Sequence, residues 1–480
     1  MYKQEGRDNL WGFRGIIVLG ARESRVQGEG SQVIINLSKG NVMGISETIT
    51  ITETKLNRIA WLSKQDSKKK FDSLMHLINC ESLIGCFHEL DKNKAVGIDG
   101  VNKMAYGSNL YGNIEELITK MKNMAYRPGP VREVHIPKEG KPGTTRPLGI
   151  SNLEDKIVQK MMQKILESIY EPLFLDCSHG FRPGRSCHTA IQALQNHLHE
   201  NEVQTVIDID LKNFFGTINH ELMENVLREK INDTKFMRYI NRMFKAGVLT
   251  DGDLRVSEEG VPQGSICSPV LSNIYAHYAI DTWIEEMVKP ACRGAIALFR
   301  YADDAVICCE YATDAERIRQ SLVKRLEKFK LRLNEEKTKL VAFDKRAAAQ
   351  GIKQETFDFL GFTFYWGKAR TGRVVPKLKT RAKTMRMKLK RVNEWAKEVR
   401  NQKPLKEIWK TLKAKLRGHV QYYGVSHNCV HVQGFLDKTT RIMFKWLNRR
   451  SQRKSFTWEQ YHLFVERNPL PEARVVHRLF

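Results

Sequence analysis

The sequence predicts an α+β protein of several units, with an all-helical region toward its C-terminal end. The first indication is length, because 480 residues exceed what one hydrophobic core usually serves. The second is an alternation of strand and helix patterns from about residue 130 to about residue 345. The third is a change beyond residue 375, where apolar residues recur at helical spacing.

The N-terminal part begins without a regular pattern and then becomes helical. Residues 1–55 mix glycines with short β-branched runs such as Thr48–Thr52, so we expect a poorly structured extension. Between Asn57 and Leu90 the spacing predicts helices, with the apolar positions Leu74, Leu77, Ile78, Leu83 and Phe87.

Residues 130–150 have the pattern of a β-hairpin with a glycine- and proline-containing loop. Lys138 and Arg146 flank that loop, one on each side. A helix is expected from Leu153 to Tyr170. The hairpin therefore presents two cations next to a turn.

The C-terminal region contains a basic amphipathic helix. Its apolar stripe is Leu405, Ile408, Trp409, Leu412 and Leu416, and the cations between are Lys406, Lys410, Lys413, Lys415 and Arg417. Tyr422 and Tyr423 follow, and two interpretations stay open for them: base stacking and core packing at a helix end. A second basic cluster includes Lys445, Arg449 and Arg450.

Charge and cysteine usage narrow the class of protein. The formal net charge is +25, which favours a polyanionic partner, although ribosomal proteins, nucleases and membrane-surface proteins share such a charge. The nine cysteines form no CxxC pair, and Cys177, His179, Cys187 and His188 lack the layout of a zinc site. No apolar run is long enough to cross a bilayer, so we expect a soluble, cytoplasmic protein with no membrane partner.

Two segments carry carboxylates that suit metal binding. In Val206–Leu211 the alternation places Asp208 and Asp210 on one strand face. In Leu298–Ile307 an apolar strand, a turn with Asp303 and Asp304, and another apolar strand form a hairpin tip. An isolated Asp-Asp pair is usually an exposed turn. Aspartates from two neighbouring strands, together with substrate phosphates, can instead hold two Mg²⁺ ions.

These residues resemble a known family. Tyr301-Ala302-Asp303-Asp304 resembles the tyrosine-x-aspartate-aspartate motif of reverse transcriptases, in the variant with alanine that resembles group II intron-encoded reverse transcriptases and maturases. The resemblance extends from about Lys55 to the C-terminus through further motifs in the same order: Arg146–Ile150, His179–Ser186, Asp208–His220, Gly260–Ser265 and Phe359–Phe362. It implies a right-hand polymerase. The expected units are a poorly structured extension at 1–55, N-terminal helices and fingers at 56–200, a palm at 201–370, a helical thumb and maturase domain at 375–440, and a basic tail at 441–480.

The resemblance also implies roles for single residues. Asp210, Asp303 and Asp304 would be the catalytic ligands of two Mg²⁺ ions, with Asp208 a neighbour. The nucleotide-binding residues would be Lys138, Arg146, Phe215, Gln263, Gly264 and Lys337, although Lys339 competes with Lys337 for the role beside the leaving pyrophosphate. The RNA-binding residues would be Lys406, Lys410, Lys413, Arg417, Tyr422, Lys445, Arg449 and Arg450.

Phe215 lies five residues after Asp210, the spacing at which the family has the aromatic residue that contacts the incoming sugar. A bulky ring there leaves no room for a 2′-hydroxyl, so the product should be DNA. Phe214 is adjacent, and either ring could instead be an ordinary core residue. A small or polar residue at this position would have favoured an RNA-directed RNA polymerase.

The implied function is copying RNA into DNA for intron mobility, together with splicing of the intron. The expected partners are group II intron RNA, an RNA template with a DNA primer, target DNA and deoxynucleotides, in a ribonucleoprotein associated with the nucleoid; a homodimer stays open. A splicing-only maturase and a domesticated or defence reverse transcriptase remain alternatives. No His-Asn-His endonuclease pattern follows residue 454, so we expect no target-strand cleavage by this chain.

Overall fold

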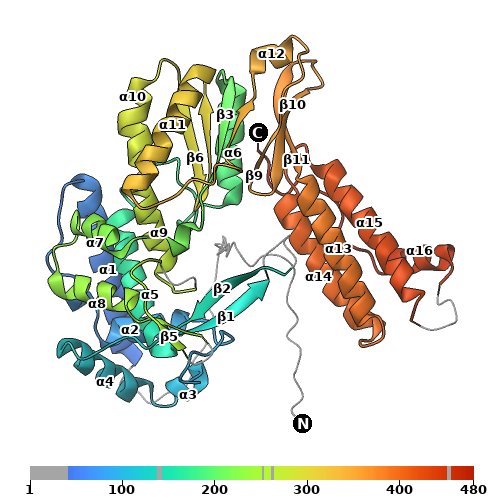
Figure 1. Ribbon diagram of the computed structural model, residues 1–480. Helices are drawn as coiled ribbons and strands as arrows, with labels where there is room; N and C mark the ends of the chain where they lie inside the picture. The colour runs from blue at the N-terminus through green and yellow to red at the C-terminus, as the bar shows by residue number, and fades with distance from the viewer. Residues whose placement is uncertain (1–41, 138–142, 251–252, 261–263, 451–455, 480) are drawn as a thin grey trace.

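The computed structural model describes residues 42–137, 143–250, 253–260, 264–450 and 456–479. They form three sheets surrounded by helices (Figure 1), which agrees with the mixed α and β class expected. Among these described residues, no helix has both the length and the apolar character needed to cross a membrane.

The central sheet has the strand order β6-β7-β3-β8, and all its pairs are antiparallel. Its strands are β3 (Thr205–Asp210), β6 (Ile296–Tyr301), β7 (Asp304–Cys309) and β8 (Lys339–Ala342). Helix α6 (Cys187–Glu200) packs on one face and α11 (Ala312–Lys328) on the other. The sheet thus separates two hydrophobic cores.

The alternation expected along β3 is confirmed. Ile207, Ile209 and Leu211 belong to the core shared with α11, while Val206 belongs to the core shared with α6. Because side chains alternate across a strand, Asp208 and Asp210 lie on the α6 side. On β7, Val306 and Cys308 lie on that same side, and so does Asp304.

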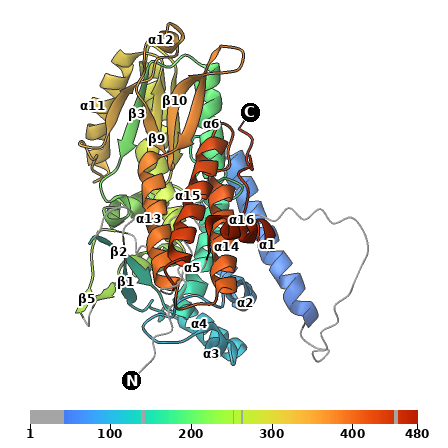
Figure 2. The ribbon, with the colours of Figure 1, turned by 90° about the vertical axis from the view of Figure 1, so that its right-hand side faces the viewer.

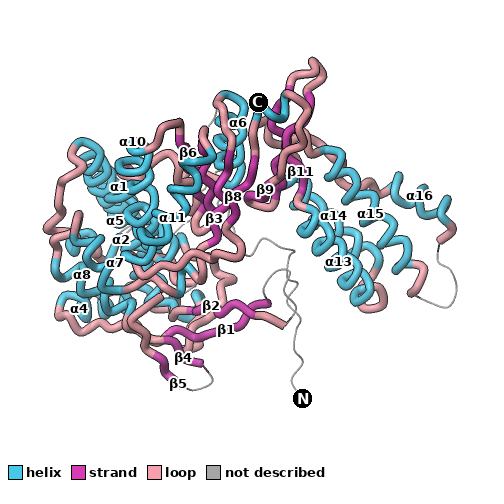
Figure 3. Tube along the Cα trace, turned by 45° about the horizontal axis from the view of Figure 1, so that its top comes forward, coloured by secondary structure: helices cyan, strands magenta, loops and turns pink. Residues whose placement is uncertain are grey.

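The N-terminal helices pack around α5 on the α11 side of the central sheet (Figures 1 and 3). They are α1 (Val42–Gln65), η1 (Met75–Leu77), α2 (Cys80–Glu89), α3 (Lys103–Gly107), α4 (Leu110–Lys122) and α5 (Leu153–Tyr170). The expected bounds of α5 are confirmed. Further along the chain come η2 (Phe214–Gly216), α7 (His220–Arg228), α8 (Thr234–Phe244), α9 (Ser268–Ala276), the π-helical η3 (His277–Asp281) and η4 (Ile284–Val288), and α10 (Lys289–Ala291).

The expected hairpin is confirmed and belongs to a second sheet, ordered β2-β1-β4-β5. Its strands are β1 (Val131–Pro137), β2 (Thr145–Ile150), β4 (Val248–Thr250) and β5 (Asp253–Arg255). Arg146 pairs with Ile136 across the hairpin. Lys138 lies outside the described residues.

The limit placed at residue 55 for a poorly structured extension is wrong. Helix α1 begins at Val42, so residues 42–55 are helical. The later turns of α1 bury Leu56 and Ile59 in the core around α5, and the Ser63 hydroxyl donates to the Ile169 carbonyl at 2.6 Å. Tertiary packing of this face overrides the low helix propensity of the β-branched run.

The C-terminal region begins with a sheet rather than a helix. β9 (Phe357–Phe359), β10 (Phe362–Lys368) and β11 (Val374–Thr380) pair antiparallel, after the short α12 (Lys345–Ala349). Placing the start of the helical unit at residue 375 is therefore wrong, because β11 occupies those residues. The alternating burial of Pro376, Leu378 and Thr380 is the strand period.

The helical unit that follows includes the residues expected to be a tail. Figure 2 shows α13 (Ala382–Val399), α14 (Leu405–Tyr423) and α15 (Cys429–Leu447) side by side, with α16 (Trp458–Arg467) across them. Trp446 and Tyr461 are buried, and Val425 bridges to His477. The described residues 441–450 and 456–479 are thus not a separate tail, because their apolar and aromatic side chains complete the hydrophobic core of this unit.

Candidate active site

The pairing register of the central sheet brings two distant aspartates together. Asp210 is the last residue of β3 and Asp304 the first residue of β7, and these two residues are directly paired. Directly opposed antiparallel residues have their Cβ atoms about 4.5–5.5 Å apart. Asp303 lies in the two-residue turn between β6 and β7. The three aspartates expected at the site therefore gather at one end of the sheet.

Asp208 is a fourth carboxylate on the same face, two residues before Asp210. Burial and the nearby charges of Asp358 and Asp210 raise the pKa of Asp208 to about 6, while Arg381 opposes the rise. Asp358 is itself paired with the Arg381 guanidinium at 2.8 Å. This pair could not be predicted from the sequence, because Asp358 lies in β9 and Arg381 lies between β11 and α13, and the position of these segments relative to β3 depends on tertiary packing.

Burial, reinforced by the crowding of these carboxylates, raises the pKa values of Asp303 and Asp304. Asp304 keeps an exposed edge, but the groups packed around its carboxyl desolvate it, and Asp303, Asp208 and Asp210 add negative charge. Together these effects raise the pKa of Asp304 to about 7. Burial also raises the pKa of Asp303, and Arg146 of the hairpin opposes it. Such a cluster favours cations, because they relieve the repulsion.

A cationic side chain already neutralises Asp210. The Lys337 ammonium donates to both carboxylate oxygens of Asp210 at 3.1 Å. Lys339 lies in β8, where it stands opposite Asp208 of β3 in the strand register. Of the two lysines left open by the sequence, Lys337 is therefore the one on the carboxylate that ends β3.

Asn334 and Thr338 also hold Asp210, and the sequence analysis assigned them no role. The Asn334 amide donates to the Asp210 carboxylate at 3.0 Å, and its backbone N–H donates to the Asp210 carbonyl at 2.8 Å. The Thr338 hydroxyl accepts from the Asp210 N–H at 3.3 Å. The available signal was the short polar run around Lys337, but nothing in it indicated which carboxylate it contacts.

The two adjacent phenylalanines after β3 differ in burial. Phe214 is buried, at 2% exposure, whereas Phe215 is half-buried and packs its ring against Phe214 with centroids 5.4 Å apart. Asn213 precedes them with φ +52°, a left-handed conformation that turns the chain after β3. Phe214 is the core residue, which leaves Phe215 as the ring with an accessible face.

The loop before α9 approaches the hairpin sheet at Gly264. This residue has φ +115°, and a Cβ there would lie 2.3 Å from the Gly149 carbonyl oxygen of β2. Glycine is thus required by the neighbouring strand, whereas the sequence analysis attributed it to a nucleotide. Gln263 lies outside the described residues.

The residues expected to bind RNA divide into two groups. Lys406, Lys410 and Arg417 are exposed on one face of α14, with Lys413 half-buried beside them. Lys445 is exposed on α15 and Arg449 is exposed just after the end of that helix, and both cations lie over the Trp446 ring. The Arg450 guanidinium donates to the Lys403 carbonyl at 3.4 Å.

Tyr422 is not available for base stacking. It is buried, and its hydroxyl donates to the Leu360 carbonyl at 2.9 Å while its ring stacks on Phe362. Of the two interpretations that the sequence left open, the core one is right. Its position at the end of an amphipathic helix turns it toward the third sheet rather than toward solvent.

The chemistry of the carboxylates fits divalent metal ions better than softer ones. Carboxylate oxygens suit Mg²⁺, which keeps several waters and shares its coordination with substrate phosphates. Within the part of the chain that the structure describes, no three His, Cys, Asp or Glu side chains are already arranged as a metal cage. Asp210, Asp303 and Asp304 are the residues that would hold Mg²⁺, with substrate oxygens completing the coordination.

We expect Asp304→Asn to stabilise the metal-free protein at high pH. The Asp304 carboxyl titrates at about 7 in the fold and near its ordinary value of 3.8 when unfolded, so the fold binds the proton more tightly. The stability penalty therefore grows as pH rises through this range and is complete above about 7. The measurement is thermal unfolding in EDTA at pH 4 and pH 8, with the variant gaining a few degrees over wild type mainly at pH 8.

The matched control is Asp437→Asn, which removes an exposed carboxylate on α15. Its difference from wild type should not change between the two pH values. Equal gains for Asp304→Asn at pH 4 and pH 8 would contradict the argument from burial and crowding.

Comparison with known proteins gives a consistent set of relatives. A family model described as "Reverse transcriptase (RNA-dependent DNA polymerase)" matches residues 136–364. Protein YkfC of Escherichia coli K12 is 37% identical over 274 residues, 51% of this chain and 71% of that protein. The group II intron-encoded protein LtrA of Lactococcus lactis subsp. cremoris is 34% identical over 223 residues, 46% of this chain and 37% of that protein.

An uncharacterised 91 kDa protein in the cob intron of Schizosaccharomyces pombe is 33% identical over 259 residues, 52% of this chain and 31% of that protein. The chain thus spans most of the first relative and about a third of the length of the other two. The matched region of the family model includes β3, β6, β7 and β8, and therefore all four carboxylates on the sheet face and in the turn.

Proposed function

The chain belongs to the reverse transcriptase family, among its group II intron-encoded members, and we propose that it copies RNA into DNA with Asp210, Asp303 and Asp304 as the catalytic residues. The observation that carries the proposal is the pairing of Asp210 with Asp304 beside Asp303, which concentrates carboxylates at one sheet end. Two Mg²⁺ ions held there would activate a primer 3′-hydroxyl and stabilise the leaving oxygen of the nucleotide.

The chain's own residues supply the rest of the chemistry. Lys337 lies against Asp210, where its ammonium can approach the negative charge that develops on the leaving pyrophosphate. Arg146 comes from the second sheet and acts electrostatically on Asp303. With Lys138 it would hold the triphosphate, as Gln263 and Gly264 would position template and nucleotide. Phe215 would lie under the sugar and exclude a 2′-hydroxyl.

The decisive experiment is primer extension by the full chain on an RNA template. We expect a DNA primer to be extended with deoxynucleotides and Mg²⁺, and not with ribonucleotides or in EDTA. A protein that binds the template and primer tightly but never extends would contradict the polymerase proposal. It would leave a splicing-only maturase as the better account.

We also propose that the protein binds group II intron RNA and promotes its splicing. The support is the exposed cationic face of α14, together with the exposed Lys445 on α15 and Arg449 just after it. Clustered cations of this kind neutralise phosphates and release counterions. The test is self-splicing of the intron that surrounds the reading frame. Purified protein should lower the Mg²⁺ concentration that splicing needs, and no change would remove this part of the proposal.

The proposed setting follows from these activities. The protein would act in the cytoplasm as a ribonucleoprotein associated with the nucleoid, with target DNA as a further partner. A homodimer remains compatible with it.

Removing three charges from α14 should weaken RNA binding in a salt-dependent way. We expect the variant Lys406→Ala/Lys410→Ala/Arg417→Ala to bind intron RNA at least about tenfold more weakly at low salt. The slope of log affinity against log salt should decrease by about 2, because each lost phosphate contact contributes about 0.7 for single strands. The measurement is filter binding across a salt series.

The control removes the same residue types elsewhere. Arg317→Ala/Lys324→Ala/Lys328→Ala takes two lysines and one arginine from α11, where all three are exposed. If both triple variants lose affinity equally, net charge rather than the α14 face determines binding.

A further inference from the structure

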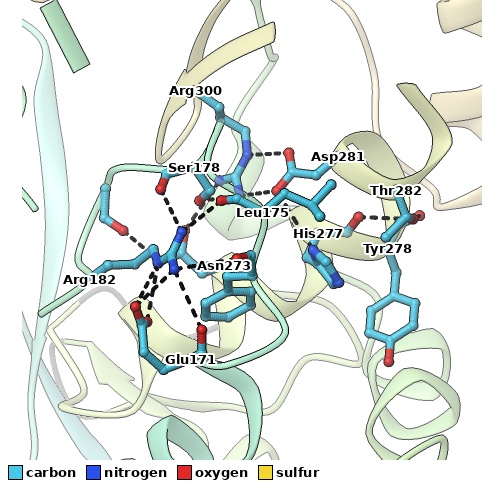
Figure 4. A network of polar contacts seen from close by, with 12 residues as sticks. Glu171, Leu175, Ser178, Arg182, Asn273, His277, Tyr278, Asp281, Thr282 and Arg300 are labelled. Carbon is cyan, nitrogen blue, oxygen red and sulfur yellow. Dashed lines mark hydrogen bonds and ion pairs between the residues drawn. The ribbon is translucent and has the colours of Figure 1, made fainter. Parts of the chain in front are cut away.

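The segment before the Asp303 turn contains a fully buried arginine. Arg300 in β6 is 1% exposed, and its guanidinium makes two charge-assisted bonds to Asp281, at 2.7 Å from Nε and 2.5 Å from Nη2 (Figure 4). Nη2 also donates to the Ser178 hydroxyl at 2.7 Å. Nη1 donates to the Asn273 side chain at 3.2 Å and to the Ala302 carbonyl at 3.1 Å. One donor of the guanidinium therefore reaches the turn itself.

From these contacts we propose that Arg300 is a positioning residue. Together with Asp281, Asn273 and the segment 177–180, it fixes the Ala302–Asp303 turn and thereby the positions of the catalytic carboxylates. Ala302 has φ +57°, a left-handed conformation that is unfavourable for alanine. Strained residues persist only where their surroundings over-determine them. The proposal rests on the polymerase function proposed above.

The segment 177–180 lies alongside β6 and is hydrogen-bonded to it. The Arg300 N–H donates to the Cys177 carbonyl at 2.8 Å, and the His179 N–H donates to the Arg300 carbonyl at 2.8 Å. Gly180 follows, and a Cβ at this position would lie 2.4 Å from the Ala302 nitrogen. The Asn273 amide also holds this segment, by donating to the Gly180 carbonyl at 2.6 Å. The motif His179–Ser186, which had no assigned role, thus begins against the back of the turn.

The helix behind the turn is shaped for this contact. Asn273 lies in α9, and Asp281 ends the π-helical segment η3. Such widened turns occur often at functional sites. Other charged or titratable groups nearby include Cys177, His277, whose Nδ1 lies 4.0 Å from an Asp281 oxygen, and Arg182, which donates to the Ser178 carbonyl at 2.8 Å.

A purely structural role for the ion pair is the alternative. A buried ion pair is weak evidence for stability, because its desolvation cost can exceed its attraction and well-packed apolar residues often replace it without loss. The geometry favours positioning, because the bonds of Arg300 end on the strained turn and on the segment that packs behind it. A misplacement of about 1 Å can reduce a catalytic rate about 100-fold.

The test uses the full chain and two variants. Arg300→Met/Asp281→Leu removes both buried charges together, so neither is left unpaired. Gly180→Ala adds one methyl group against the Ala302 nitrogen. For both we expect kcat of primer extension to fall about 100-fold and the Mg²⁺ concentration at half-maximal rate to rise. The KM for deoxynucleotide and the affinity for template and primer should stay within about threefold.

The matched control is Gly184→Ala in the same loop. Gly184 has a left-handed conformation, at φ +69°, and nothing lies within 4 Å of the added Cβ. This variant should lower the thermal midpoint and leave kcat close to wild type. The comparison therefore separates loss of stability from displacement of the turn.

The possible results distinguish the positioning role from a purely structural role and from failure of the polymerase proposal. If the double variant is unfolded, Gly180→Ala alone decides. If a folded variant keeps kcat within threefold of wild type, or loses activity only through weaker binding of template and primer, the positioning role is wrong. If the wild type itself does not extend a primer, the polymerase proposal fails instead, which is a distinguishable result.

Discussion

Replacing Asp303 and Asp304 together by alanine is expected to abolish primer extension while leaving RNA binding intact. Asp303 ends the turn between β6 and β7, and Asp304 begins β7 opposite Asp210. Their removal takes away the negative charge that would hold the metal ions. Loss of even one strong electrostatic stabiliser costs about 10²–10³-fold in rate, so the double variant should fall below detection.

The measurement combines a single-turnover extension assay with a filter-binding assay on the same preparation. Glu335→Ala/Glu336→Ala is the matched control, because it also removes two adjacent exposed acidic residues from a loop near Asp210. The control should extend the primer at close to the wild-type rate. Residual extension by Asp303→Ala/Asp304→Ala above about one hundredth of wild type would mean that the essential carboxylates lie elsewhere.

Replacing Phe215 by valine is expected to admit ribonucleotides. The ring of Phe215 is half-buried and rests on Phe214, so shortening it opens space without emptying the core. Steric discrimination by a few carbon atoms is worth about 10–200-fold, and we expect the preference for deoxynucleotides to fall by about 100-fold. Extension with deoxynucleotides should continue within about tenfold of wild type.

Single-nucleotide incorporation with matched deoxy and ribo substrates measures this preference directly. Phe214→Val is the informative companion, because its ring is buried and truncation leaves a cavity. It should lower the thermal midpoint and keep sugar selection. If Phe214→Val relaxes selection and Phe215→Val does not, the two rings have been assigned the wrong way round.

Local sequence patterns predicted much of the fold because the secondary structure of these segments follows from their own spacing of apolar and polar residues. The alternation in Val206–Leu211, the hairpin at 130–150 and the helix Leu153–Tyr170 each reflect a burial period that short segments carry by themselves. The carboxylate positions followed from the same periods. Residues 42–55 were misjudged because their helix is stabilised by packing, which the β-branched run does not reveal.

Contacts between distant segments could not be predicted in the same way. Arg300 reaches Ser178 and Asp281, and Asn334 reaches Asp210, through the packing of the sheet on its helices. From the sequence, Tyr422 could serve in base stacking or in core packing, and Trp446 lies within the basic cluster of Lys445, Arg449 and Arg450; both rings complete a core. Distinguishing a buried ring from a stacking ring requires knowing what lies opposite it.

The register between β3 and β7 has a practical consequence for preparations of the protein. Because strand side chains alternate, a slip by one residue would turn Asp210 toward the core of Ile207 and Ile209 and would separate it from Asp304. A misregistered molecule would therefore be inactive rather than weakly active. The burst amplitude of a single-turnover assay would then count correctly folded molecules, and the enzyme could serve as its own standard for refolding yield.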